Sequence, residues 1–412
     1  MIDKQPENSG EFSIILSLDY GQVVLETESI KEFYFIESIS NYCITGKLKF
    51  FDQYGVFEIG PITGNEMIAI TYGEEDNIDK VFYIYKMSKI EGDATVQAGT
   101  TQTIDIFFTD SMFYGLNFLQ FSKSWKDEKI SDIIFDISED ILGVSKWDWK
   151  KETSNKLEYF YSPYWSPHTS LDYLLKRGEE ISSKTPGLCW YNNSKGSNLV
   201  SIDTLLNQSK LMTIDNEDDG IYVFEDSNLF LFNKILHWSI SGIDNTALRN
   251  LSGRTLLRFN NNTKTFNVIE KKYTDMLKNH VVLGKNSLYN DKSDVKNGFE
   301  YRGDDNDTEI ETMYQHNWNK LYDNQQIINI NVRGHENRYC GGMIEIKWPS
   351  MEQTTQIFNS NLQGKYLIKS ITHYFSGYVN PSYSQKLVLI KNGYEDSQAK
   401  ELVKSTKRNL AK

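Results

Sequence analysis

The residues that could carry out chemistry are scattered along this 412-residue chain. None of the patterns GxSxG, HExxH or GxGxxG occurs, and no phosphate-binding GxxxxGK loop is present. Paired carboxylates for glycoside hydrolysis stay open, because 56 acidic residues always offer pairs. The six histidines stand singly, at His168, His237, His280, His316, His335 and His373. We therefore expect no enzyme, no catalytic residue and no nucleotide site, and we expect His373, which lies within a strand pattern, to be structural.

Metal ligands are also poorly grouped. Cys43, Cys189 and Cys340 lie far apart and show no CxxC or CxxH spacing, so they indicate reduced thiols of a chain folded in a cytoplasm. The acidic runs at 215–219 and 304–307 could bind Ca²⁺, but neither has a glutamate at the twelfth position of a calcium loop, and the run from Asp304 also lacks a glycine at the sixth. We expect solvated loops there, no metal and no cofactor.

One aromatic cluster could recognise a ligand by stacking. It comprises Tyr159, Phe160, Tyr161, Tyr164, Trp165 and His168. Such a cluster could be a sugar platform, but aromatic side chains more often serve a core or a protein interface. The neighbouring Trp147, Asp148 and Trp149 are accounted for by a strand with tryptophan on one face.

The composition indicates protein contacts more than nucleic-acid binding. The formal net charge is −12, which disfavours a surface that grips phosphates. The negative charge is consistent either with simple solubility or with a channel through which DNA slides without binding. Aromatic residues make up 13 % of the chain, as strands and large interfaces require.

The elements that position these residues are mostly strands. Alternation of apolar and polar residues, broken by turn residues, predicts a small barrel or sandwich in the first 110 residues and antiparallel strands in the last 90. The predicted strands are 12–19, 22–27, 31–37, 43–52, 65–73, 80–88 and 102–109, then 326–333, 342–348, 366–375 and 385–391.

The middle of the chain changes period. A helical stripe of isoleucines predicts a helix over 127–142, ending at Gly143, and a second helix is expected over about 168–183. Residues 187–205 indicate a hairpin. Further expectations are strands within 228–283, including two around a polar turn, a loop over 284–309, and a helix at about 309–323.

Several sequence segments resemble those of a known protein family. They are FDQYGVFEIGPITGNEMIAITYG at 51–73 and, near the end, VRGH, GGMIEIKWPS, GKYLIKSITHYF and YSQKLVLIK. In this order they resemble the baseplate hub proteins of contractile tails in T-even-type bacteriophages, and the hub part of type VI secretion spike proteins.

The resemblance implies a mainly β fold with an α+β insertion, that is, two similar antiparallel β-barrel domains plus a mixed middle domain. It implies the domain limits 1–113 for the first barrel, 114–220 and 242–309 for the middle domain, and 221–241 and 310–395 for the second barrel. Residues 396–412 then form a C-terminal arm.

The resemblance also implies a structural role in a virion tail baseplate that is assembled in the bacterial cytoplasm. A homotrimer would present six barrels, joining a sixfold tail tube to a threefold central spike. Implied partners are the spike, the tail tube or tube-initiator proteins, wedge or other baseplate proteins, and DNA or a tape measure passing through the lumen. The alternatives are the hub of a type VI or other contractile injection system, and a carbohydrate-binding or hydrolytic tail protein.

The arm is the one segment where the residues themselves point to docking. It carries five Lys/Arg and two Asp/Glu, opposite in sign to the rest of the chain, and Leu402, Val403 and Leu410 fit one helical stripe. We expect it to dock on a neighbouring protein, and the alternative is a frayed terminus. The polar N-terminus indicates no signal peptide, and no apolar run is long enough for a membrane helix.

Overall fold

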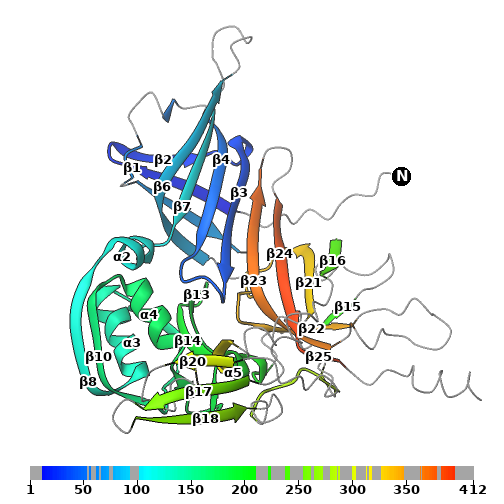
Figure 1. Ribbon diagram of the computed structural model, residues 1–412. Helices are drawn as coiled ribbons and strands as arrows, with labels where there is room; N and C mark the ends of the chain where they lie inside the picture. Colours follow the sequence, from blue (N-terminus) through cyan, green and yellow to red (C-terminus); the bar gives the residue numbers. More distant parts are fainter. Residues whose placement is uncertain are drawn as a thin grey trace, which may run out of the picture.

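The computed structural model shows a mainly β chain in which a long curved sheet rests beside a mixed α+β domain (Figure 1). It describes residues 12–52, 55–56, 62–64, 66–73, 78–92, 102–209, 221–223, 237–241, 254–260, 264–271, 279–284, 286–287, 299–302, 312, 315–317, 326–347, 362, 364–377 and 382–394. The arm, with Leu402, Val403 and Leu410, lies outside these residues, and so do the acidic runs at 215–219 and 304–307.

The N-terminal half-sheet has the order β3-β4-β7-β6-β5-β1-β2, and every pairing in it is antiparallel. All seven predicted strands form, because their alternating apolar residues share one buried face. Its elements are β1 (Phe12–Leu18), β2 (Gly21–Leu25), η1 (Thr27–Ser29), β3 (Ile30–Ser38), β4 (Thr45–Asp52), β5 (Met67–Tyr72), β6 (Ile78–Gly92) and β7 (Gln102–Thr109).

The C-terminal half-sheet has the order β16-β21-β24-β23, and β22 and β15 continue from β23. The alternation predicted for 326–333 is confirmed, since Ile328, Ile330 and Val332 are all buried in the second core. Its elements are β15 (Ile221–Val223), β16 (His237–Ser241), β21 (Gln326–Arg333), β22 (Met343–Lys347), β23 (Gly364–Ser376) and β24 (Ser382–Lys391).

The two half-sheets repeat one another in topology. Taken in chain order, the strands of both halves follow the same spatial order: β3-β4-β7-β6-β5-β1 in one and β16-β21-β24-β23-β22-β15 in the other. One difference is that β15 runs parallel to β22, whereas β1 runs antiparallel to β5. The strands β15 and β16 come from 221–241 and join strands more than 80 residues further along the chain. The exact domain limits stay a prediction.

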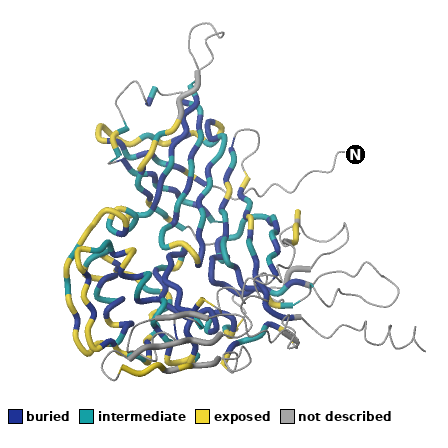
Figure 2. The backbone as a smooth tube through the Cα atoms, in the orientation of Figure 1, coloured by how far each residue is buried: buried dark blue, intermediate teal, exposed yellow. Residues whose placement is uncertain are grey.

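The middle domain packs its helices over the hairpin β13–β14 and the ribbon β8–β10, around a third core (Figures 1 and 2). Helix α4 begins where the Ser166 side chain accepts a hydrogen bond from the Thr169 N–H, with Pro167 in the first turn. The domain comprises α2 (Met112–Phe118), β8 (Phe121–Lys129), α3 (Ile130–Asp136), η2 (Ile137–Ile141), β9 (Trp147–Lys150), β10 (Lys156–Trp165), α4 (Pro167–Leu175), β11 (Glu179–Glu180), β12 (Thr185–Pro186), β13 (Leu188–Asn192), β14 (Ser197–Ser201) and α5 (Ile202–Leu206).

Three expectations for this region were wrong in part. The helix over 127–142 begins only at Ile130, because the residues before it pair with β10 as far as Lys129. The helix over 168–183 ends at Leu175, because Glu179 and Glu180 pair with Pro186 and Thr185 as the short strands β11 and β12.

The third is the loop expected over 284–309, which contains two strands among its described residues. They are β19 (Asn286–Ser287), which pairs with β25 (Gly393–Tyr394), and β20 (Phe299–Arg302), which pairs with β17 (Arg254–Asn260).

The two strands predicted around a polar turn are confirmed as β17 and β18 (Thr265–Lys271). Of the helix predicted at 309–323, only 312 and 315–317 are described, and they are helical. No helix in the described part of the chain is long and apolar enough to cross a membrane.

Candidate functional site

The most distinctive site is the seam where the two half-sheets become one. Strand β23 pairs antiparallel with β3, from Ser370 opposite Ser38 to Phe375 opposite Phe33. The described strands of both halves therefore belong to a single sheet of 13 strands (Figure 1). Backbone pairing over this length fixes the orientation of one half relative to the other.

Aromatic rings fill the space under the seam. Phe375 stacks on Tyr383 with 4.4 Å between ring centroids and an angle of 2°, and its ring lies 5.7 Å from that of Phe33. Phe35 and Tyr72 complete the group, at 6.1 Å and 5.3 Å from Phe375. Phe375 and Tyr383 belong to the C-terminal half by sequence but to the N-terminal core by contact. The two halves therefore share one apolar core at this point.

A polar cluster lies buried beside these rings. The Glu37 carboxyl group accepts a hydrogen bond from the Cys340 N–H at 3.4 Å, and its other oxygen lies 3.9 Å from Nε2 of His373. The His373 Nδ1 shares a 2.7 Å hydrogen bond with the Tyr383 hydroxyl, which in turn accepts one from Gln385. Burial raises the pKa of Glu37 to about 7 and lowers the pKa of His373 to about 3, because removal from water disfavours both charged forms.

The chemistry of this cluster is structural. Glu37 and His373 are both fully buried, so no macromolecular substrate reaches them. The His373 ring also stacks on Phe35, with 4.3 Å between centroids. Buried polar groups of this kind fix a unique packing when their partners are in place.

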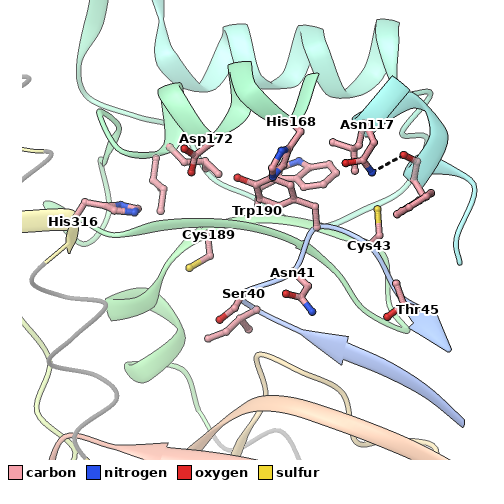
Figure 3. A pocket seen from close by; sticks show the side chains of 16 residues that line it. Ser40, Asn41, Cys43, Thr45, Asn117, His168, Asp172, Cys189, Trp190 and His316 are labelled. Atoms are coloured by element: carbon pink, nitrogen blue, oxygen red, sulfur yellow. Dashed lines mark hydrogen bonds between the residues drawn. The ribbon is translucent and has the colours of Figure 1, made fainter. Parts of the chain in front are cut away.

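A cavity of about 340 Å³ lies between the N-terminal half-sheet and the middle domain (Figure 3). His168 and Asp172 of α4 face it from one side, and the turn after β3 faces it from the other. The ring of Tyr42 contacts the rings of His168 and Trp190 at 4.9 Å and 5.5 Å. Burial and the neighbouring Asp110 raise the pKa of the Cys43 thiol well above its usual range, so it is protonated and a poor nucleophile.

The aromatic cluster seen in the sequence divides between the core and the surface. Phe160 is buried and stacks on Trp125, with 5.4 Å between centroids. Tyr159, Tyr161 and Tyr164 are exposed. Exposed tyrosines in a row are typical of protein interfaces and of sugar platforms alike.

The predicted site residues are not brought together by the described structure. Leu402, Val403 and Leu410 lie outside it, and no group of three metal-binding side chains occurs in the residues that it covers. The sequence reasoning missed Glu37, although a signal was present. Glu37 has the same parity in β3 as the buried Phe33 and Phe35, so the sequence places an ionisable group on the core face.

Comparison with known proteins shows what this fold is. No family model and no curated protein matches the sequence. Among solved structures, the 43 kDa tail protein of prophage MuSo2 from Shewanella oneidensis is similar, with a TM-score of 0.57 and 12 % identity, over 93 % of this chain and 99 % of that one. A tail protein from Neisseria meningitidis MC58 has a TM-score of 0.57 and 8 % identity, over 92 % of this chain and 97 % of its own.

A chain of the half-lidded PdpA–VgrG complex of Francisella is similar as well. Its TM-score is 0.50 and its identity 10 %, over 94 % of this chain and 59 % of that one. At these identities the likeness concerns the fold alone. The resemblance to hub-like tail proteins is thereby confirmed at the level of the fold: the chain has the mainly β architecture of phage tail proteins.

Proposed function

We propose that this protein is the hub of a contractile tail baseplate, a structural ring rather than an enzyme. The observation that carries the proposal is the internal repeat, in which two half-sheets of the same strand order lie side by side in one chain. Three copies of such a chain supply six similar units. A threefold assembly can then present a nearly sixfold surface to a tail tube on one side and a true threefold surface to a spike on the other.

The seam supports this role because it holds the two units at one fixed angle. The sheet continues from β3 to β23, and the aromatic group around Phe375 belongs to both halves. An adaptor needs this rigidity, since a flexible linker between the units would not maintain the spacing of a ring.

The charge supports a channel role. Each copy carries −12, so three copies give a strongly acidic ring. Where such charge lines a lumen, it repels DNA phosphates, and the genome or a tape measure passes without binding. The expected partners are therefore the spike, the tail tube or its initiator, and surrounding baseplate proteins, within a virion tail.

The test is an electron-microscopy image of the purified protein together with its mass in solution. We expect a threefold ring with a central hole, the mass of three chains, and a subunit interface above about 2,000 Å², as obligate assemblies have. One, two or six copies around the axis would contradict the proposal.

The hub of a type VI or other contractile injection system is the first alternative, because the Francisella chain has a similar fold. Purification of the native particle distinguishes the two, since a phage hub copurifies with a capsid-bearing tail. A carbohydrate-binding tail protein is the second alternative, and the exposed Tyr159, Tyr161 and Tyr164 favour it over a hydrolase. Binding to a glycan array would support that alternative.

A further inference from the structure

The repeat extends to single residues of the long strands β6 and β23. Tyr83 is the last residue of β6 to pair with β5 and the first to pair with β7. In the same way, Leu367 is the last residue of β23 to pair with β22 and the first to pair with β24. Two residues later each strand has a β-bulge, at Tyr85 and at Lys369. The two strands are therefore equivalent position by position.

A hydrogen bond next to the bulge supports the same alignment. The Ile84 N–H donates to the Glu66 carbonyl at 3.0 Å, and the Ile368 N–H donates to the Gly342 carbonyl at 2.8 Å. In both halves the acceptor directly precedes the first residue of the neighbouring strand. Backbone geometry, and not only strand order, is repeated.

The equivalent strands β6 and β23 differ beyond the bulge, where another strand pairs with one edge of β23 but not with the same edge of β6. In β23 that edge is covered, because residues from Ser370 to Phe375 pair with β3. In β6 the opposite edge carries β7, and beyond Tyr83 no strand within the described residues covers the other edge. An uncovered strand edge is a template for pairing with another chain.

The partner of β23 also has an equivalent with an open edge. Strand β3 pairs with β4 and β23, whereas β16 pairs with β21 alone among the strands that the structure describes. Phe35 and Ile240 occupy the same register position in β3 and β16, through their partners Gly46 and Ile328. Phe35 is 0 % exposed, but Ile240 is 37 % exposed. The C-terminal half thus lacks the cover that the N-terminal half has.

Exposed aromatic side chains lie beside the open edge of β6. Phe113 contacts the rings of Tyr85, Tyr114 and Phe118, at 5.4, 5.8 and 6.2 Å between centroids. The Tyr114 hydroxyl donates to the Ile84 carbonyl at 3.3 Å, which holds this group next to the bulge. Phe118 is 71 % exposed. Aromatic residues at the surface next to an unpaired edge are typical of a protein interface.

We propose that the open edge of β6 in one copy pairs antiparallel with the open edge of β16 in the next copy. This contact repeats between molecules the β23–β3 pairing that each molecule contains within itself. It rests on the proposed ring function and specifies its interface. Because two different surfaces meet, the contact is head-to-tail, as a closed ring of three copies requires, whereas an isologous dimer would pair like with like.

The repeat also predicts the register of this contact. Within the chain Thr372 of β23 lies opposite Ile36 of β3. Strand β6 has an extra bulged residue, Ser88, so the position equivalent to Thr372 is Lys89, and the position equivalent to Ile36 is Ser241. Lys89 of one copy should therefore face Ser241 of the next, with Cα atoms about 4.5–5.5 Å apart. Such a distance allows a disulfide.

The test uses two single-cysteine additions, Lys89→Cys and Ser241→Cys, purified separately. When the two variants are mixed and oxidised, we expect a disulfide-linked dimer that contains one of each. Neither variant alone should cross-link, which also controls for the native Cys43, Cys189 and Cys340. The double variant should give a covalent trimer. As a matched control, Val24→Cys lies on the exposed strand β2 and should not cross-link with Lys89→Cys.

The outcomes separate this inference from the proposed function. Threefold rings without the Lys89–Ser241 cross-link would overturn the inference and leave the hub function in place. Cross-linking of either single variant to itself would also overturn it, because that result requires an isologous contact. A chain that stays monomeric at every concentration would overturn both. A second variant, Phe118→Ser, should weaken assembly roughly tenfold or more without lowering the melting temperature of the subunit.

Discussion

Oε1 of Glu37 lies 3.9 Å from Nε2 of His373, across the pair of strands that joins the two halves of the sheet. These two groups shift in opposite directions on burial: the pKa of Glu37 rises from 4.5 to about 7, and the pKa of His373 falls from 6.5 to about 3. Below about pH 7 both side chains are thus favoured in their neutral forms. In that range the seam holds Glu37 and His373 without an ion pair between them, which is the less costly arrangement in a dry core.

The first prediction concerns the pH dependence of stability. The contribution of Glu37 is present below pH 4.5 and is lost as pH rises to about 7, since only the unfolded chain ionises easily in that window. The contribution of His373 is present above pH 6.5 and is lost as pH falls to about 3. The two slopes oppose each other between pH 4.5 and 6.5, so the free energy of unfolding should change little there.

Single substitutions should reveal the pH dependence of the free energy of unfolding that each residue causes. In Glu37→Gln the free energy of unfolding should rise with pH up to 6.5, and in His373→Gln it should fall with pH from 4.5 to about 7. Each slope has an upper limit of about 1.4 kcal/mol per pH unit. Urea denaturation from pH 4 to pH 8 measures both. Curves that run parallel to the unmodified protein would show that the pair does not titrate as described.

The second prediction concerns the aromatic core of the seam. Phe375→Ala removes a fully buried ring that stacks on Tyr383, so it should lower the free energy of unfolding by about 3–5 kcal/mol. Val24→Ala is the matched control, because Val24 is exposed on β2 and should change stability by less than about 0.5 kcal/mol. Thermal unfolding of both variants gives the comparison. Equal melting temperatures would mean that the halves do not depend on this packing.

Much of the fold was predictable from the sequence, because alternation in strands is a local signal. The strands of the N-terminal half and β21 to β24 follow from it, the helices of the middle domain follow from the helical stripe of isoleucines, and only the resemblance placed 221–241 with the C-terminal half. The repeat was implied only by resemblance, since equivalent positions differ in size. Gly46 opposite Phe108 fills the same position as Ile328 opposite Leu389. One half thus pairs a small residue with a large one, where the other half pairs two residues of medium size. The total side-chain volume of the pair is similar in both halves, although the amino acids differ.

The seam and its polar cluster were not predictable in the same way. Glu37 and His373 lie 336 positions apart in the chain, and no local pattern records which strand edges meet. Helix limits failed for a related reason. Residues up to Lys129 pair with β10, and this long-range pairing, rather than any local pattern, sets the start of the helix at Ile130.

The third prediction follows from the size exchange at Gly46. A Cβ atom there would lie 2.3 Å from the Tyr34 carbonyl oxygen and 2.4 Å from the Phe108 ring, so Gly46→Ala forces backbone or ring to move. We expect a loss of about 1–3 kcal/mol or more. Gly115→Ala in α2 is the control, because its Cβ would meet only a methyl group of Leu142 at 3.1 Å and alanine favours a helix. A Gly46→Ala variant as stable as the control would contradict the packing at this position.

The fourth prediction concerns the exposed tyrosines of β10. The double change Tyr159→Ser and Tyr161→Ser should leave the melting temperature of the subunit nearly unchanged, because both rings face solvent. If this face docks a neighbouring tail protein, the variant should lose copurification with the native particle. Phe160→Ser is the contrasting variant, since its buried ring should be needed for folding. Normal particle yield from the double variant would exclude a docking role for these two rings.

The last prediction concerns the C-terminal arm, residues 396–412. Its net positive charge on a chain of −12, and its apolar stripe of Leu402, Val403 and Leu410, fit a segment that docks on an acidic neighbour. Seventeen residues are about the shortest length that forms a helix alone in water, so we expect order to come from the partner.

Truncation after Tyr394 keeps the β25 pairing with β19 and should reduce assembly with the spike or tube while leaving subunit stability intact. Changing the three apolar residues to serine should have the same effect, whereas Ser405→Ala, a small polar change within the arm, should have none. Assembly of the truncated protein at normal yield would show that the arm is not a docking element.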